Sequence, residues 1–328
     1  MSIEWVRKYE PVMHFAMGEN FFPMNAAGYV SHCSLHASDG DMLIPPPFVD
    51  LQALAEFPSR DHFLTYASRR VGKTEDEEAL RRWIERQRTE RADFRAFLKE
   101  LKDKAKSIGV NMAKIFLPLK LPVEVRDRAI ANYGGIGKNP PTYYYRVLDD
   151  HGYTVLQYWF FYAYNDFGST HGGVNDHEAD WESIHLFLKD DEPVWAAYSS
   201  HLGGGKEIGR PWDPAKMNFE DDHPIVYVGA GSHASYHTSE GDPGVEGFEP
   251  GNVVVGSAGG IPWAEPQPLD APWFTDYQGL WGWYAWDNPN PVVKILSAKG
   301  GAPAGPKFDR EGGIRPKWDK PAEYAGLA

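Results

Sequence analysis

The sequence predicts a mainly β protein, built as a two-sheet β-sandwich with a helical insertion. Aromatic residues make up 14% of the 328 residues, and the chain also holds 33 Gly and 26 Pro. This combination favours short strands joined by shaped loops. β-branched and aromatic residues fill several segments after residue 141, with Gly, Pro and Asp between them. The predicted strands are 142–147, 154–164, 181–188, 194–200 and 224–229.

The longest predicted helix covers residues 74–108. Thr74 and Glu77 form a capping box at its start, and apolar residues then recur at helical spacing as far as Ile108. Gly109 follows as a C-terminal stop signal. The middle of this stretch is almost entirely charged or polar, so a break or a protrusion is expected there.

A second, shorter helix is predicted over residues 123–133, ended by Gly134 and Gly135. The helical block of about 74–134 interrupts a β-rich chain, so we interpret it as an insertion. Its apolar stripe is too small to form a core by itself. The whole chain, 1–328, is therefore expected to be one domain, with a Gly/Pro-rich tail of about 299–328 lying on its surface.

Charge and cysteine content restrict the possible partners and compartment. The net charge is −13, which repels phosphate backbones, so we expect no nucleic-acid partner. Cys33 is the only cysteine, which rules out an intrachain disulfide and favours a reducing compartment. No signal-peptide pattern opens the chain, and no apolar run is long enough for a transmembrane segment. We expect a cytoplasmic protein, or one exported without a cleaved signal peptide.

Two carboxylates lie on one face of a predicted strand. Residues two apart in a strand share a face, so Asp180 and Glu182 point the same way, and Ile184, Leu186 and Leu188 continue that face. Burying two like charges together costs several kcal/mol unless a positive charge compensates them. A divalent cation is the simplest compensation. The alternative is that both carboxylates line a solvated strand end.

Two further side chains can reach the same point. His177 lies in the segment just before the strand, and Asp166 follows the preceding aromatic strand. Three carboxylates and one imidazole suit Mg²⁺ or Ca²⁺, with Mn²⁺ also possible, because oxygen donors dominate and sulfur is absent. We therefore predict one divalent cation held by Asp166, His177, Asp180 and Glu182.

His201 and His233 are the candidate catalytic residues. His201 ends the predicted strand 194–200, and His233 follows the predicted strand 224–229. Loops at one end of a β-sandwich often gather function, so both imidazoles are predicted to lie at the same end as the cation. The alternative for each is a histidine that is hydrogen-bonded at a strand end for structural reasons.

Several ordered motifs in this chain resemble one family. They are YEPVMHFAMGENFFP at 9–23, LQYWFFYAYND at 156–166, HEADWE at 177–182, YSSH at 198–201, HPIVYVGAGSHASY at 223–236 and GLWG at 279–282. Together they resemble the vacuolar protein sorting-associated protein 62 family of fungi and its bacterial relatives. The resemblance covers most of the chain outside the helical block.

A more distant similarity is to the necrosis-inducing, cytolysin-like proteins of plant pathogens. Their heptapeptide Gly-His-Arg-His-Asp-Trp-Glu aligns with residues 176–182, and this implies cation ligands at His177, Asp180, Glu182 and the upstream Asp166. Those proteins are β-sandwiches that bind sphingolipid head-group sugars and damage membranes. This chain departs from them at Asp176 and Ala179, and it lacks their secretion signal and disulfides.

Three functions follow as expectations. The first is cation-dependent recognition of a small polar ligand, such as a glycan or a glycolipid head group. Trp159, Tyr164, Trp181 and Trp195 would then offer flat faces to sugar rings, although such residues more often lie in a core. The second is a metal-dependent enzyme acting on a phosphate, diphosphate or sugar, with His201 or His233 as acid or base. The third is a membrane-damaging toxin.

Overall fold

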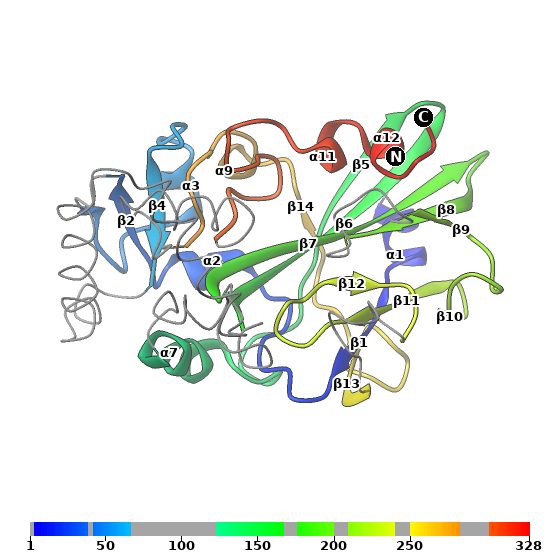
Figure 1. Ribbon diagram of the computed structural model, residues 1–328, viewed down its shortest axis with the longest axis horizontal. Coiled ribbons are helices and arrows are strands. Elements are labelled where there is room, and N and C mark those ends of the chain that lie inside the picture. The colour runs from blue at the N-terminus through cyan, green and yellow to red at the C-terminus, as the bar shows by residue number, and fades with distance from the viewer. Residues whose placement is uncertain are drawn as a thin grey trace, which may run out of the picture.

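A computed structural model describes residues 3–38, 42–66, 123–166, 176–199, 209–239, 250–282 and 302–328. The described part is mainly β, as the sequence predicts, with three sheets and short helices around them (Figure 1). The long helix predicted over 74–108 falls outside the described residues. The shorter helix is present as α7, Val123–Tyr133.

The largest sheet has six strands in the order β14-β5-β6-β7-β8-β9. Its long central hairpin, β6 with β7, supplies most of the candidate site. β7 begins at His177, several residues before the predicted strand, so His177 belongs to the strand and not to the preceding loop. The bounds are β14 Gln267–Pro268, β5 Tyr144–Asp150, β6 Tyr153–Asn165, β7 His177–Lys189, β8 Glu192–Tyr198 and β9 Gly209–Pro211.

A second sheet of five strands packs against one face of the first. Its order is β10-β11-β1-β13, and β12 also pairs with β11. Strands β1 and β11 are parallel, with Val12 opposite Ile225. The bounds are β1 Val12–Ala16, β10 Phe219–Glu220, β11 His223–Val228, β12 Ser235–Tyr236 and β13 Pro250–Val255.

The two sheets share one hydrophobic core, which makes them a sandwich. Side chains of β6 and β7 meet side chains of β1, β11 and β13 there, and each large apolar side chain that is fully buried contributes about 1.5–3 kcal/mol to folding. Members of this core include Phe15, Tyr158, Phe160, Ile184, Leu186, Val226 and Val255.

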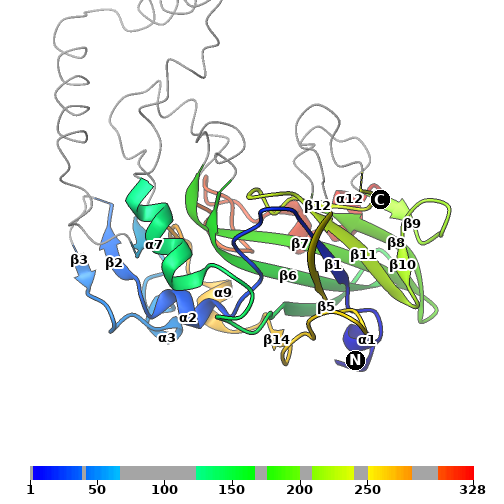
Figure 2. The same cartoon turned by 90° about the horizontal axis from the view of Figure 1, so that it is seen from below.

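The five-stranded sheet lies in front of β6 and β7 in Figure 2, and most of the other elements pack against the opposite face of the six-stranded sheet. An aromatic core lies there, beneath a small sheet of the order β3-β2-β4 and several helices. The strands are β2 Ser34–Ala37, β3 Met42–Ile44 and β4 His62–Thr65. The helices on this side are α2 Ala26–Val30, α3 Leu51–Leu54, α9 Pro272–Thr275, α11 Pro316–Asp319 and α12 Pro321–Tyr324. The remaining helix, α1 Ile3–Lys8, packs into the sandwich core through Val6.

The C-terminal segment is anchored more firmly than a surface tail. Trp318 packs in the aromatic core, and Ala322 and Ala325 pack against β6, β7 and β8. Within the described ranges, no helix is both long enough and apolar enough to cross a membrane.

Candidate functional site

The shared face of Asp180 and Glu182 exists as predicted. In the register between β6 and β7, Asp180 lies opposite Tyr162, and Glu182 lies opposite Phe160. Both aromatic residues belong to the sandwich core, as do Ile184, Leu186 and Leu188 further along β7. Asp180 and Glu182 are both buried, which excludes the alternative of a solvated strand end.

The backbone at Ala179 separates Glu178 from this face. Ala179 has a φ of 57°, a left-handed conformation that non-glycine residues adopt rarely. Regular alternation would place Glu178 beside Asp180. Instead, Glu178 accepts a hydrogen bond from Thr65 Oγ1 of β4 at 3.1 Å, on the other side of the sheet. The irregularity therefore leaves Asp180 and Glu182 as the acidic pair of the sandwich face.

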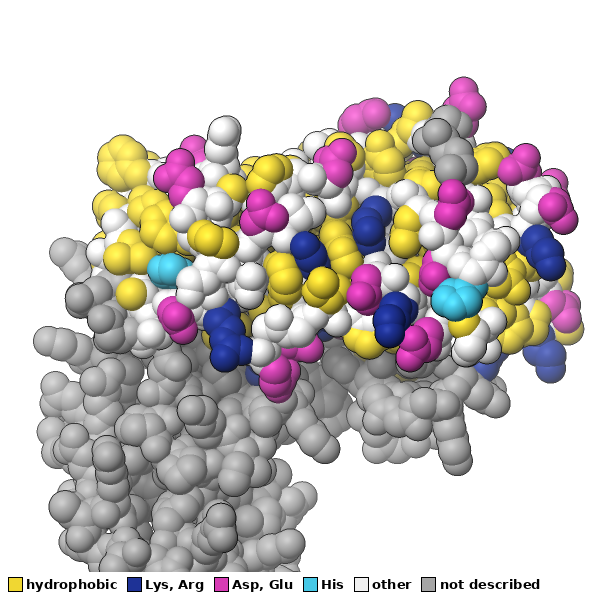
Figure 3. All heavy atoms as spheres, turned by 90° about the horizontal axis from the view of Figure 1, so that it is seen from above, with side chains coloured by type: hydrophobic (Ala, Val, Ile, Leu, Met, Phe, Trp, Pro, Cys, Tyr) yellow, Lys and Arg dark blue, Asp and Glu magenta, His cyan; other side chains and the backbone are white. Residues whose placement is uncertain are grey.

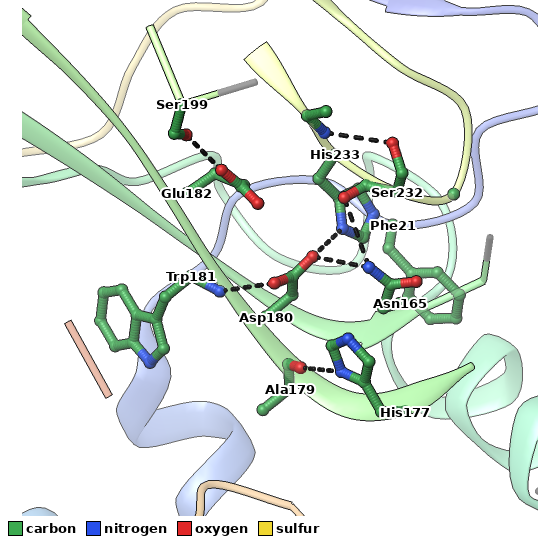
Figure 4. Close-up of polar contacts among 12 residues, drawn as sticks. Phe21, Asn165, His177, Ala179, Asp180, Trp181, Glu182, Ser199, Ser232 and His233 are labelled. Atoms are coloured by element: carbon green, nitrogen blue, oxygen red, sulfur yellow. Dashed lines mark hydrogen bonds and ion pairs between the residues drawn. The ribbon is translucent and has the colours of Figure 1, made fainter. Parts of the chain in front are cut away.

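Asp180 is the centre of a buried hydrogen-bond network (Figure 4). Its Oδ2 accepts from Asn165 Nδ2 at 2.9 Å and lies 3.1 Å from Nδ1 of His233. Its Oδ1 accepts from the backbone N–H of Trp181 at 2.9 Å. Burial alone would raise the pKa of Asp180, but the hydrogen bond from His233 and the nearby His177 lower it to about 2.

His233 lies between two buried carboxylates. Its Nδ1 faces Asp180, and its Nε2 is 3.6 Å from Oε1 of Glu19. Its ring stacks on Tyr162 at 3.9 Å, with an interplanar angle of 2°. Burial lowers the pKa of His233, but the charge of Glu19 and the contact with Asp180 outweigh it and raise that pKa to about 10. His233 is therefore an imidazolium at neutral pH and compensates the charge of Asp180.

Backbone amides hold Glu19 in place. Its Oε1 accepts from the N–H groups of Asn20 at 2.8 Å and Phe21 at 2.7 Å, and its Oε2 accepts from Gly231 at 2.7 Å. Burial would raise the pKa of Glu19, but His233 and these amides lower it. The result is a fixed row of carboxylate, imidazolium and carboxylate, formed by Glu19, His233 and Asp180.

A backbone hydrogen bond fixes one ring nitrogen of His177. Its Nδ1 donates to the carbonyl of Ala179 at 2.7 Å, which leaves the lone pair on Nε2. Burial lowers its pKa to about 4, so the ring is neutral at pH 7. In Figure 4 the second ring nitrogen lies on the side of Asp180 and Asn165. A backbone hydrogen bond of this kind commonly fixes the tautomer of a metal-binding histidine.

Glu182 continues the row toward the end of β8. It accepts a short hydrogen bond from Ser199 Oγ. Burial and the charge of Asp180 raise the pKa of Glu182 to about 8, although Lys317 acts in the opposite direction. Proton loss from this carboxyl group is therefore unfavourable at neutral pH unless a further positive charge comes close to it.

Asp166 points to a different partner. It directly follows the last residue of β6. Its carboxylate forms an ion pair with Nε of Arg126 from α7 at 2.9 Å. Burial raises the pKa of Asp166 in spite of this partner. Sequence reasoning did not identify Arg126, because its contact with Asp166 depends on how α7 packs against the hairpin.

The structure thus brings together part of the predicted set. His177, Asp180 and Glu182 follow one another along β7, with His233 bonded to Asp180, whereas Asp166 is paired with Arg126. Across the described ranges, no three His, Cys, Asp or Glu side chains converge closely enough to hold a metal ion. His201 lies outside the described residues.

Sequence reasoning missed Glu19 and Asn165. Asn165 directly precedes Asp166, which was predicted to be a cation ligand. An amide next to a carboxylate in the sequence could have indicated that Asn165 also belongs to the site. Glu19 lies in a loop far from β7 in the chain, and neither spacing nor periodicity pointed to it.

The aromatic residues considered for sugar contact belong to the cores. Trp159, Tyr164 and Trp181 are buried in the aromatic core, and Trp195 packs beside the C-terminal segment. The protein itself therefore covers the faces of Trp159, Tyr164 and Trp181, and Trp195 is only partly buried.

Fold and site together define a mainly β sandwich protein with a buried carboxylate–histidine row beside its central hairpin. No family model and no curated protein matches this chain. Solved structures with a partial likeness include the Necrosis and Ethylene inducing Protein 2 from the causal agent of cocoa's witches' broom disease, at 22% identity and a TM-score of 0.29. That match covers 45% of this chain and 58% of the other.

The protein NLPPya gives two further matches. Its complex with glucosamine is 18% identical, with a TM-score of 0.26, and its complex with mannosamine is 16% identical, with a TM-score of 0.25. Each match covers 37% of this chain and 52% of the other, so the matched part spans about half of those proteins. At these TM-scores the likeness is distant and assigns no ligand to this chain.

Proposed function

We propose that this protein binds a divalent cation, Mg²⁺, Ca²⁺ or Mn²⁺, and uses it to recognise a small polar ligand such as a glycan or a glycolipid head group. The observation that carries the proposal is the row of His177, Asp180 and Glu182 on one buried face of β7. The resemblance of the HEADWE and LQYWFFYAYND motifs to the necrosis-inducing proteins supports the same residues.

The donor chemistry of this row fits a hard cation. Two carboxylates and a neutral imidazole would supply oxygen and nitrogen ligands, and Asp166 would add a third carboxylate on release from Arg126. Once bound, such a cation coordinates hydroxyl or carbonyl oxygens of a ligand. The chain's own part is to hold Asp180 through Asn165 and His233, and His177 through the Ala179 carbonyl.

The direct test is cation binding by the full chain. Mn²⁺ binding, followed by electron paramagnetic resonance, should be saturable in the parent protein and at least about tenfold weaker in Glu182→Gln. Asp149→Asn is the matched control, because Asp149 is an exposed carboxylate on β5 of the same sheet. Equal Mn²⁺ affinity in all three proteins would reject the site. Glycan binding with and without chelator then tests the ligand class.

Cation affinity should also depend on pH. Because the pKa of Glu182 is raised to about 8, a proton must leave this carboxyl group before it binds a cation. Mn²⁺ affinity should therefore rise as the pH increases toward about 8, and calorimetry in buffers of different ionisation enthalpy should show proton release. An affinity that is constant over this range would show that Glu182 is not a ligand.

The ion pair between Asp166 and Arg126 predicts how a substitution of Arg126 changes the affinity for Mn²⁺. Arg126→Met removes a positive charge and frees the Asp166 carboxylate, so Mn²⁺ binding should tighten by about tenfold. Arg128→Met, on the same helix, is the matched control. Weaker Mn²⁺ binding in Arg126→Met would place Asp166 outside the ligand set and give the pair a structural role.

A further inference from the structure

A second group of polar residues lies on the opposite face of the central hairpin, beneath the C-terminal helices. His185 and Ser183 of β7 lie opposite Gln157 and Trp159 of β6. The C-terminal segment covers them and is fastened through its backbone. Gln157 Nε2 donates to the carbonyl of Lys317 at 2.9 Å, and Arg146 Nη1 donates to that of Trp318 at 2.6 Å.

His185 and Ser183 are buried without hydrogen-bond partners for their side chains. Neither ring nitrogen of His185, nor the hydroxyl of Ser183, has a partner among the residues that the structure describes. Their relative exposures are 0% and 1%. The His185 ring centroid lies 5.9 Å from that of Trp159 and 5.8 Å from that of Tyr324. Buried polar groups are normally paired, so three unpaired atoms in one layer need an explanation.

Two cations lie beside these groups. Lys317 Nζ lies 4.9 Å from the centroid of the Trp159 ring, and its charge is among the causes that lower the pKa of His185. Arg315 donates through Nε to the carbonyl of Phe308 at 2.7 Å. Within the described ranges neither cation forms an ion pair, although both are only partly exposed.

The pKa values of Arg315 and Lys317 indicate that both cations are poorly solvated. Burial lowers the pKa of Arg315, and burial together with the charge of Arg315 lowers the pKa of Lys317 to about 8, despite the carboxylate of Glu182. The two cations therefore repel each other in a poorly solvated place. Figure 3 shows the side of the molecule that carries α11 and α12, where a few basic side chains lie between hydrophobic ones.

We propose that His185, Ser183 and Lys317 form a binding site for the phosphate group of a ligand, with Arg315 adding the second positive charge. An N–H group, a hydroxyl group and an ammonium group are donors, which is the chemistry that phosphate oxygens require. A phosphate carries nearly two negative charges at neutral pH and so matches two cations better than a single carboxylate does. This site uses the face of β7 opposite to the proposed cation row, although the carboxylates of Glu182 and Asp180 in that row still attract Lys317 and Arg315.

The test uses the full chain, with inorganic phosphate as the probe. Calorimetry should show saturable binding of phosphate in the parent protein, and a Kd that is at least about tenfold higher in Lys317→Met. Methionine keeps most of the apolar stem of Lys317 and removes its charge, and Lys317→Arg should restore most of the affinity. Lys320→Met is the matched control, because Lys320 is exposed in the same segment and faces Glu323 at 3.5 Å.

His185→Phe separates a binding role from a structural one. Phenylalanine fills a similar space without polar atoms, so the Tm without phosphate should be unchanged or higher, while phosphate binding should be lost. A large fall in Tm, with phosphate binding retained in Lys317→Met, would overturn the proposal. Phosphate also stabilises proteins generally by exclusion from their surface, but this effect is common to the parent and Lys320→Met.

Two further probes define the ligand. Acetate at matched ionic strength should not bind, and acetate binding as strong as that of phosphate would refute the preference for a doubly charged group. Glycerol 3-phosphate that binds more tightly than inorganic phosphate would identify the phosphate as part of a larger ligand. Equal or weaker binding of the ester would identify free phosphate as the occupant, and the site itself would stand in either case.

Discussion

Asp180→Ala should lower the free energy of unfolding by about 3–5 kcal/mol and abolish Mn²⁺ binding. The carboxylate of Asp180 is buried and contacts Asn165, His233 and the backbone of Trp181. Its removal takes away the carboxylate that lies 3.1 Å from Nδ1 of the His233 imidazolium, and the amide of Asn165 loses an acceptor. Urea denaturation followed by circular dichroism measures the first effect.

Asp180→Asn keeps the binding measurement possible if the alanine variant is too unstable. It preserves the shape of the side chain and removes its charge, so Mn²⁺ affinity should fall by at least about 100-fold with a smaller loss of stability. Asp149→Asn should change neither quantity, because its side chain is exposed on the same sheet. Normal stability and normal Mn²⁺ binding in Asp180→Asn would show that Asp180 is not the centre of the site.

Glu19→Gln should be the second most damaging change, with an expected loss of about 3–5 kcal/mol at neutral pH. Glu19 is distant from β7 in the chain, but its carboxylate lies beside the buried His233 imidazolium and accepts three backbone hydrogen bonds. Glutamine keeps the size of the side chain but removes one of the carboxylates beside the imidazolium. It also replaces one carboxylate oxygen by an NH₂ group, which cannot accept a hydrogen bond from the backbone N–H groups. Glu56→Gln, at an exposed position, is the control.

The pH dependence of the free energy of unfolding distinguishes the charge interaction of Glu19 and His233 from an ordinary packing contact. The pKa of His233 in the folded protein is raised to about 10, above its ordinary value of about 6.5. Its charge therefore stabilises the fold fully below about pH 6.5, and this contribution is lost as the pH rises toward 10. In Glu19→Gln the loss should occur at lower pH, because one of the two carboxylates that raise this pKa is gone.

A double-mutant cycle gives the coupling between the two residues. If Glu19 acts through His233, the variant Glu19→Gln/His233→Gln should lose less stability than the sum of the two single changes. The opposite outcome is that the two losses of stability are strictly additive and that the pH dependence of stability is unchanged in Glu19→Gln. Glu19 would then act only by holding the loop that contains Asn20 and Phe21.

Local patterns were enough to predict several features of this protein. The alternation of side chains along a strand placed Asp180 and Glu182 on the face of Ile184, and that face is buried in the sandwich. The apolar runs located the long hairpin of β6 and β7, and Gly134 with Gly135 marked the end of α7. Each of these features depends on residues that are close in the chain, where spacing and backbone preference decide the outcome.

The tertiary structure alone decided which charges meet. The left-handed backbone at Ala179 turned Glu178 to the other face, although strand alternation would have placed it beside Asp180. Packing of α7 gave Asp166 an arginine partner, and packing of the 19–21 loop placed Glu19 against His233. The sequence indicated that the buried acidic pair needs a positive charge beside it. It could not foresee that an imidazolium 53 residues away from Asp180 would supply part of it, because the energy of a buried charge depends on neighbours that only the fold brings together.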